Sequence, residues 1–143
     1  MVRVTGRYVL ASLACGAAWG LIAWLLWPER ATAHEPTVAV VMSPLIGLLI
    51  GVCFVWIHRL EKAGRVFVAL LSLYVAAALF GMCVGIGEWA ERRHLGPSVI
   101  ASAAVIENMI GTLWGLTFMF YFVVMWPLAY FNHQWLGRLA RRT

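Results

Sequence analysis

Aspartate is absent from the 143 residues of this chain, and charged residues of all kinds make up only 12%. A soluble domain of average composition carries about twice that share of charge. Apolar residues amount to 63%, against about half in soluble domains. The shortage of charge and the excess of apolar side chains predict an integral membrane protein, surrounded by lipid and forming one domain over 1–143.

Motifs of catalysis and cofactor binding are missing as well. The sequence contains no P-loop, Rossmann glycine pattern, G-x-S-x-G, H-E-x-x-H or kinase signature. The cysteines, Cys15, Cys53 and Cys83, form no C-x-x-C pair and are odd in number, which argues against a disulfide framework or a thiolate metal site. We therefore expect a protein that is not an enzyme, and nothing in the sequence requires a cofactor.

Long apolar runs, by contrast, are abundant. A helix that crosses the hydrocarbon of a bilayer needs roughly 20 apolar residues, and four segments meet this requirement. The predicted spans cover about 8–27, 37–57, 66–87 and 109–131. Because the links between them are short, we expect an all-α, up-down antiparallel bundle of four transmembrane helices.

The last apolar run, 99–131, is too long for one simple crossing. Its 33 residues would rise about 50 Å, whereas the hydrocarbon core is about 30 Å thick. We place the crossing at 109–131, with Trp126 and Tyr130 in the cytoplasmic aromatic belt. The segment 98–106 then forms a surface helix, a loop or a projection of the span beyond the outer boundary.

Lysine and arginine are unevenly shared between the two sides of the predicted bundle. Eight of the eleven flank the N-terminus, the second link and the tail: Arg3, Arg7, Arg59, Lys62, Arg65, Arg138, Arg141 and Arg142. The first and third links hold Arg30, Arg92 and Arg93. The positive-inside rule places both termini in the cytoplasm, which predicts a multi-pass protein of a bacterial inner membrane. These basic residues are not interleaved with aromatics, so nucleic-acid binding is not expected.

Every predicted span carries two glycines four residues apart. The pairs are Gly16 and Gly20, Gly47 and Gly51, Gly81 and Gly85, and Gly111 and Gly115. Small residues one turn apart let helix backbones approach closely in lipid. These grooves either pack the spans of the chain against one another or receive the helix of a partner membrane protein or of a second copy.

Proline occurs inside the second predicted span, at Pro44. A proline there removes a backbone hydrogen bond and can kink the helix. The hydroxyl of the preceding Ser43 is placed to satisfy a carbonyl that the proline leaves open. We therefore expect a structural kink at this point and not a gating hinge.

Two groups of polar residues are candidates for a functional site at the predicted outer side. Glu107 and Asn108 stand at the start of the last span, and we place them at the outer interface; a buried Glu107 would instead indicate a transport pathway. The second group could supply carboxylate and imidazole ligands to a metal, although a solvated ion-pair cap is the expected role. Its members are Glu88, Glu91, His94 and His34.

His58 and His133 lie at the predicted cytoplasmic ends of the second and fourth spans. They could approach each other there, where an imidazole could ligate a haem, a pigment or a metal at the membrane interface. A bis-histidine haem within the bilayer requires histidines at depth on facing helices, a pattern that this sequence lacks. We expect both to be ordinary polar interfacial side chains.

Three functions are compatible with these features. The first is a non-catalytic accessory or structural subunit, or an assembly factor, of a larger inner-membrane complex such as an energy-transducing one. The second is a small oligomeric transporter or channel with Glu107 in its pathway. The third is a metal-binding membrane protein that uses Glu88, Glu91 and His94. The scarcity of polar groups at depth favours the subunit, because transport and catalysis in the membrane need such groups.

Overall fold

The computed structural model describes residues 4–26, 35–92, 99–118 and 121–141, and these ranges contain helices and turns but no strand. The helices are α1 (Gly6–Leu26), α2 (Glu35–Cys53), the short 3-10 helix η1 (Val55–Arg59), α3 (Lys62–Arg92), α4 (Val99–Phe118) and α5 (Tyr121–Arg141). The predicted all-α class is confirmed for this part of the chain. Two segments are long and apolar enough to cross a membrane, Gly6–Leu25 in α1 and Lys62–Ala90 in α3.

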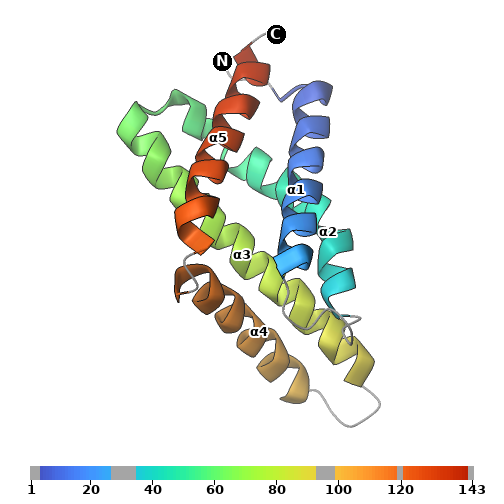
Figure 1. The fold of residues 1–143 in the computed structure, drawn as a ribbon. Coiled ribbons are helices and arrows are strands. Elements are labelled where there is room, and N and C mark those ends of the chain that lie inside the picture. The colour runs from blue at the N-terminus through green and yellow to red at the C-terminus, as the bar shows by residue number, and fades with distance from the viewer. Residues whose placement is uncertain (1–3, 27–34, 93–98, 119–120, 142–143) are drawn as a thin grey trace.

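The helices run alternately between two ends of an elongated bundle (Figure 1). α1 runs from the first end to the second, α2 returns, α3 runs out again, and α4 followed by α5 makes the fourth pass. The start of α1, η1, the start of α3 and the end of α5 lie at the first end, which we call the basic end. These segments contain the basic residues whose side chains the structure describes: Arg7, Arg59, Lys62, Arg65 and Arg138. The second end, which we call the far end, contains the end of α3 and the start of α4.

The fourth pass differs from the single helix predicted over 109–131. α4 ends at Phe118 and α5 begins at Tyr121, so the predicted span is divided between two helices. The two helices differ in their partners: α4 lies along α3, whereas α5 packs against α3, α1 and η1. Its contact with α1 includes a hydrogen bond from the Cys15 thiol to Asn132 Oδ1 at 2.6 Å. Of the segment 98–106, predicted as a surface helix, a loop or a projection of the span, residues 99–106 belong to the first half of α4 and residue 98 lies outside the described residues.

Proline within α2 is accommodated by a side-chain hydrogen bond. Pro44 cannot donate to the carbonyl of Val40 four residues earlier. Ser43 Oγ donates to that oxygen instead, at 2.7 Å, and the predicted role of Ser43 is confirmed. α2 ends at Cys53, a turn earlier than the predicted span, because the chain tightens into η1.

Small clusters of buried side chains hold the helices together. At the basic end, Tyr8 of α1 packs against Leu136 of α5. Near the middle of the bundle, Leu73 of α3 packs against both Leu116 of α4 and Ala129 of α5. The two halves of the fourth pass are thus joined through α3.

Large apolar side chains are exposed around the bundle. Each of the long helices contributes at least one that is more than half exposed: Leu10, Val41, Phe67, Ile110 and Val124. Exposed large apolar side chains in such number mark surfaces that contact other molecules or a membrane, and a helix that is apolar on all sides is typical of lipid surroundings. The outer surface is therefore suited to contact with lipid.

Candidate functional site

α1 and α2 face each other through matching rows of small residues. Each row is a serine followed by two glycines at four-residue intervals: Ser12, Gly16 and Gly20 on α1, and Ser43, Gly47 and Gly51 on α2. Because the helices are antiparallel, Ser12 lies opposite Gly51, Gly16 opposite Gly47, and Gly20 opposite Ser43. A Cβ on Gly16 would lie only 2.8 Å from Gly47 Cα. Both backbones approach this closely because the glycines have no side chain.

Of the two glycine pairs on α3 and α4, only the pair of α3 lies in the contact between these helices. A Cβ on Gly81 would lie 2.7 Å from Met109 Cα, and one on Gly85 would lie 2.8 Å from the carbonyl oxygen of Ala104. The backbone of α4 therefore rests directly on α3. The glycines of α4 itself take no part in this contact.

Gly111 and Gly115 lie on another side of α4 and have open space before them. Among the residues that the structure describes, nothing lies within 4 Å of a Cβ built at either position. Glu107 precedes Gly111 by one turn and is exposed, as are Ile110 and Trp114. We call these five residues, Glu107, Ile110, Gly111, Trp114 and Gly115, the outer face of α4.

Asn108, next to Glu107 in the sequence, turns toward α3 instead. Its Nδ2 donates to Glu88 Oε2 at 2.6 Å and to the carbonyl oxygen of Ala104 at 2.9 Å. The structure thus joins one residue of the predicted polar pair to one residue of the predicted metal set. The two neighbours, Glu107 and Asn108, face different surroundings and do not form a single site.

The predicted metal set is described only in part. His34, His94 and the side chain of Glu91 lie outside the described residues. Among the residues that the structure does describe, no group of three or more His, Cys, Asp or Glu side chains is placed to hold a metal ion. The Glu88 carboxylate accepts its hydrogen bond from Asn108.

His58 and His133 meet at the basic end, as their positions at the span ends allowed. Both side chains are buried, with 8% and 6% of their surface exposed, and their ring centroids lie 6.4 Å apart. The His58 ring rests on Gly137 of α5, where a Cβ would lie 2.7 Å from His58 Nδ1. Gly137 therefore lets η1 pack closely against α5.

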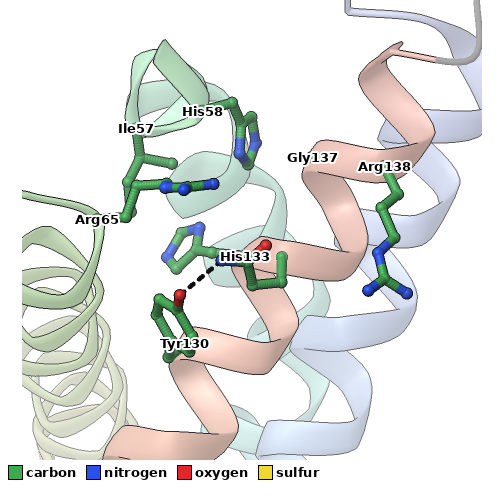
Figure 2. Close-up of a pocket in the computed structure, with 8 residues that line it drawn as sticks. Ile57, His58, Arg65, Tyr130, His133, Gly137 and Arg138 are labelled. Atoms are coloured by element: carbon green, nitrogen blue, oxygen red, sulfur yellow. Dashed lines mark hydrogen bonds between the residues drawn. The ribbon is translucent and has the colours of Figure 1, made fainter. Parts of the chain in front are cut away.

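The two imidazoles line a cavity of about 130 Å³ at the basic end, and we take this cavity as the candidate site (Figure 2). Its other lining residues come from η1, α3 and α5: Ile57, Arg65, Tyr130, Gln134, Gly137 and Arg138. Pockets that bury drug-sized ligands measure about 300–1,000 Å³. A cavity of this size does not enclose a haem or a comparable pigment, but it admits a small polar group.

The protonation of His133 follows from its contacts. Ser72 Oγ donates to the carbonyl oxygen of Ala69 at 2.8 Å, and therefore accepts from His133 Nε2 at 2.7 Å. In the neutral ring the lone pair is then on Nδ1, which is buried without a protein hydrogen-bond partner. Burial, and secondarily the neighbouring His58, lower the pKa of His133 from 6.5 to about 4. His133 lies outside the predicted span 109–131 and is neutral at pH 7.

Sequence analysis located the two histidines of this site but not their neighbours. Tyr130, His133, Gln134 and Gly137 recur at intervals of three and four residues, so they share one face of α5. That spacing is a usable signal. In the sequence alone, however, Tyr130 fits the aromatic belt and Arg65 fits the charge asymmetry of the links, so neither stands out as part of a site.

Comparisons with protein-family models, curated proteins and solved structures found no significant match. The fold itself defines the class: a helical protein with two helices that could cross a membrane. Function is therefore inferred from the contacts of particular residues.

Proposed function

We propose that this protein is a non-catalytic subunit or assembly factor that docks onto a larger membrane complex through the outer face of α4. One observation carries the proposal. The glycine pairs of α1, α2 and α3 are occupied by helices of the same chain, whereas Gly111 and Gly115 have nothing within 4 Å among the described residues. Helices associate in lipid at such small-residue grooves, so an unfilled groove suits a helix from outside the chain.

We further propose four membrane passes, with both termini on the cytoplasmic side of a bacterial inner membrane. The gathering of the described basic side chains at one end supports this orientation. The start of α1 and the end of α5 also lie at that end. α4 and α5 together make the fourth pass in this arrangement.

The contact between α3 and α4 supports an interfacial depth for Glu107. The apolar stretch of α3, 66–87, ends just before Glu88. Asn108 bonds to that carboxylate, so the two residues lie at one level, which we take as the outer boundary of the hydrocarbon. Glu107 is then at the interface, on the surface that α4 turns away from the bundle.

The partner is a helix of a different membrane protein. Two copies of this chain related by a two-fold axis along the membrane normal would bring their α4 helices together in parallel. The two Glu107 carboxylates would then face each other one turn before the glycines, and opposed like charges are costly. A partner helix with small residues and a basic or amide side chain opposite Glu107 avoids this repulsion and adds a charge-assisted hydrogen bond.

The other two functions draw less support from the described contacts. A transport pathway through one copy needs polar groups facing the bundle interior, and Glu107 is exposed on the outer face of α4. A metal site at Glu88 would compete with the hydrogen bond from Asn108. The subunit is the function that we propose.

Gentle solubilisation of native membranes tests this proposal. The wild-type chain is expected to migrate on native gels in an assembly much larger than its own 15.9 kDa, with other membrane proteins in fixed proportion. Gly111→Leu adds bulk at a position where a Cβ meets no described atom within 4 Å, so the assembly should be lost while the isolated protein still folds. Val41→Leu adds apolar bulk at an exposed position of α2 and should leave the assembly intact. A wild-type chain that migrates alone, or an equal effect of both variants, would refute docking through α4.

A further inference from the structure

Among the described residues, those that line the cavity at the basic end include several bases and no carboxylate. Its ionisable residues other than Tyr130 are His58, Arg65, His133 and Arg138. The described acid nearest to them in the sequence, Glu61, is exposed and does not line the cavity. Cationic groups around a partly enclosed space attract anions. They also disfavour a metal cation, despite the two imidazoles.

Two polar atoms of the cavity wall are positioned for a ligand. Arg65 Nε and His133 Nδ1 are both buried, and neither has a hydrogen-bond partner in the described part of the protein. Figure 2 shows the Arg65 guanidinium lying between the rings of His58 and His133. A buried donor or acceptor without a partner is unfavourable, so an incoming group that satisfies both atoms would be favoured.

A third donor is available at the same wall. The Tyr130 hydroxyl accepts a hydrogen bond from Gln134 Nε2 at 2.8 Å. Its own hydrogen can therefore be donated to another acceptor. A group with several oxygen acceptors could thus bond to Arg65, His133 and Tyr130 together.

We propose that this cavity binds the phosphate group of an anionic ligand, with Arg65 Nε–H as a fixed donor and His133 Nδ1 as a donor that forms by proton uptake. His133 Nε2–H is already donated to Ser72. When Nδ1 takes up a proton from water, His133 becomes an imidazolium. It then donates its Nε2–H to Ser72 and its Nδ1–H to the anion. A guanidinium and an imidazolium are both strong partners for phosphate oxygens. The phosphate could belong to an anionic lipid of the cytoplasmic leaflet or to a free phosphate of the cytoplasm.

Anion binding and protonation are coupled in this site. The ionisable residues that line the cavity with His133 are His58 from η1, Arg65 from α3, and Tyr130 and Arg138 from α5, and none of them is a carboxylate. A bound phosphate supplies the missing negative charge and raises the pKa of His133. Because binding of each phosphate is coupled to the uptake of one proton, the affinity for phosphate should fall by up to about tenfold per unit rise in pH.

The test uses the full-length protein in neutral, phosphate-free detergent with ¹⁵N-labelled histidine. One sample is titrated with inorganic phosphate, a second with phosphatidylglycerol and a third with phosphatidylcholine. We expect a saturable shift of the His133 ring nitrogens toward imidazolium with phosphatidylglycerol or phosphate, and tighter binding at pH 5.5 than at pH 7.5. A response to phosphatidylglycerol alone identifies a lipid headgroup, and a response to inorganic phosphate identifies a free anion.

Matched variants separate this site from general attraction to the basic end. Arg65→Gln should weaken binding at least tenfold, whereas Arg59→Gln, which removes the same charge from an exposed residue outside the cavity, should change it less than twofold. His133→Gln should abolish the pH dependence of whatever binding remains, and it serves as the test if Arg65→Gln does not fold. The absence of a saturable response to both phosphate and phosphatidylglycerol, equal losses in Arg59→Gln and Arg65→Gln, or an unchanged pH dependence in His133→Gln would overturn the proposal.

Discussion

At the scale of single residues, glycines with the same spacing have different surroundings. Gly16 and Gly47 are pressed against each other's backbone between α1 and α2, while Gly111 and Gly115 face open space. The spacing shows where helices could approach, but only the rotation of each helix about its axis decides which glycine is covered. The difference between covered and uncovered glycines can be measured by replacing one glycine of each kind with alanine.

Gly47→Ala should lower the free energy of unfolding by about 1–3 kcal/mol, because the added methyl would collide with backbone atoms of Gly16. Gly111→Ala adds the same methyl to open space and removes a glycine from a helix, so it should be neutral or stabilising by up to about 1 kcal/mol. Denaturant titration in detergent micelles measures both. Equal destabilisation by the two variants would contradict the arrangement of α1 against α2.

A second prediction at this scale concerns pH. The pKa of His133 is about 4 in the folded protein and 6.5 when unfolded, so the unfolded chain binds more protons between these values. Stability should therefore be constant above about pH 7, fall as the pH drops from 6.5 toward 4, and lose at most about 3 kcal/mol over that window. Unfolding free energies measured from pH 4 to pH 8 in the absence of phosphate give this slope. In His133→Gln the slope should flatten, and an unchanged slope would assign the effect to another group.

At the scale of secondary structure elements, the register between α3 and α4 depends on one polar contact within an apolar interface. Asn108 is held by Glu88 at the level where Gly85 of α3 rests on Ala104. Small residues do not interlock across the interface, so on their own they would let α4 shift along the axis of α3. A directional hydrogen bond to a carboxylate fixes one position along the helix axis.

A double-mutant cycle tests this contact. Asn108→Leu and Glu88→Ala should each destabilise the protein, and their coupling free energy should be about 1–2 kcal/mol, as expected for a half-buried hydrogen bond to a charged group. The measurement is the free energy of unfolding of the wild type, both single variants and the double variant. Additive effects would show that α3 and α4 are held in register by other residues.

Much of the helical architecture could be predicted from the sequence because it depends on runs of apolar residues. The helical class and the role of Ser43 beside Pro44 follow from local chemistry. The division of 109–131 between α4 and α5 does not, since it goes with tertiary contacts, of α4 with α3 and of α5 with α3, α1 and η1. The same holds for the site: His58 and His133 were found by their position at span ends, but the Ser72 contact that fixes the tautomer depends on how α3 and α5 are rotated.

At the scale of the whole molecule, the two ends of the bundle differ in charge and in chemistry. The basic end contains the dihistidine cavity, and the half of α4 nearer the far end contains Glu107 and the contact between Asn108 and Glu88. In the proposed orientation the cavity opens toward the cytoplasm and the carboxylates lie at the outer boundary. Each end can then meet a different class of partner, phosphate on one side and a protein helix on the other.

Cysteine labelling tests this orientation. Ala63 and Ala103 are both exposed, the first near the basic end and the second in α4 near the far end. In a background in which Cys15, Cys53 and Cys83 are replaced by Ala, a membrane-impermeant maleimide added to intact spheroplasts should label Ala103→Cys and spare Ala63→Cys. Labelling of Ala63→Cys but not of Ala103→Cys would show that the topology is the reverse of the one proposed.

Site-specific photo-crosslinking in native membranes tests the central claim, docking through the outer face of α4, most directly. A photoreactive residue at Ile110 reports on that face, and the same residue at Phe67, which is similarly exposed on α3, serves as the control. We predict that position 110 crosslinks to one other membrane protein, that Gly111→Leu abolishes this product, and that position 67 gives no protein adduct. Adducts to lipid alone at both positions, or to the same protein at both, would contradict docking through α4.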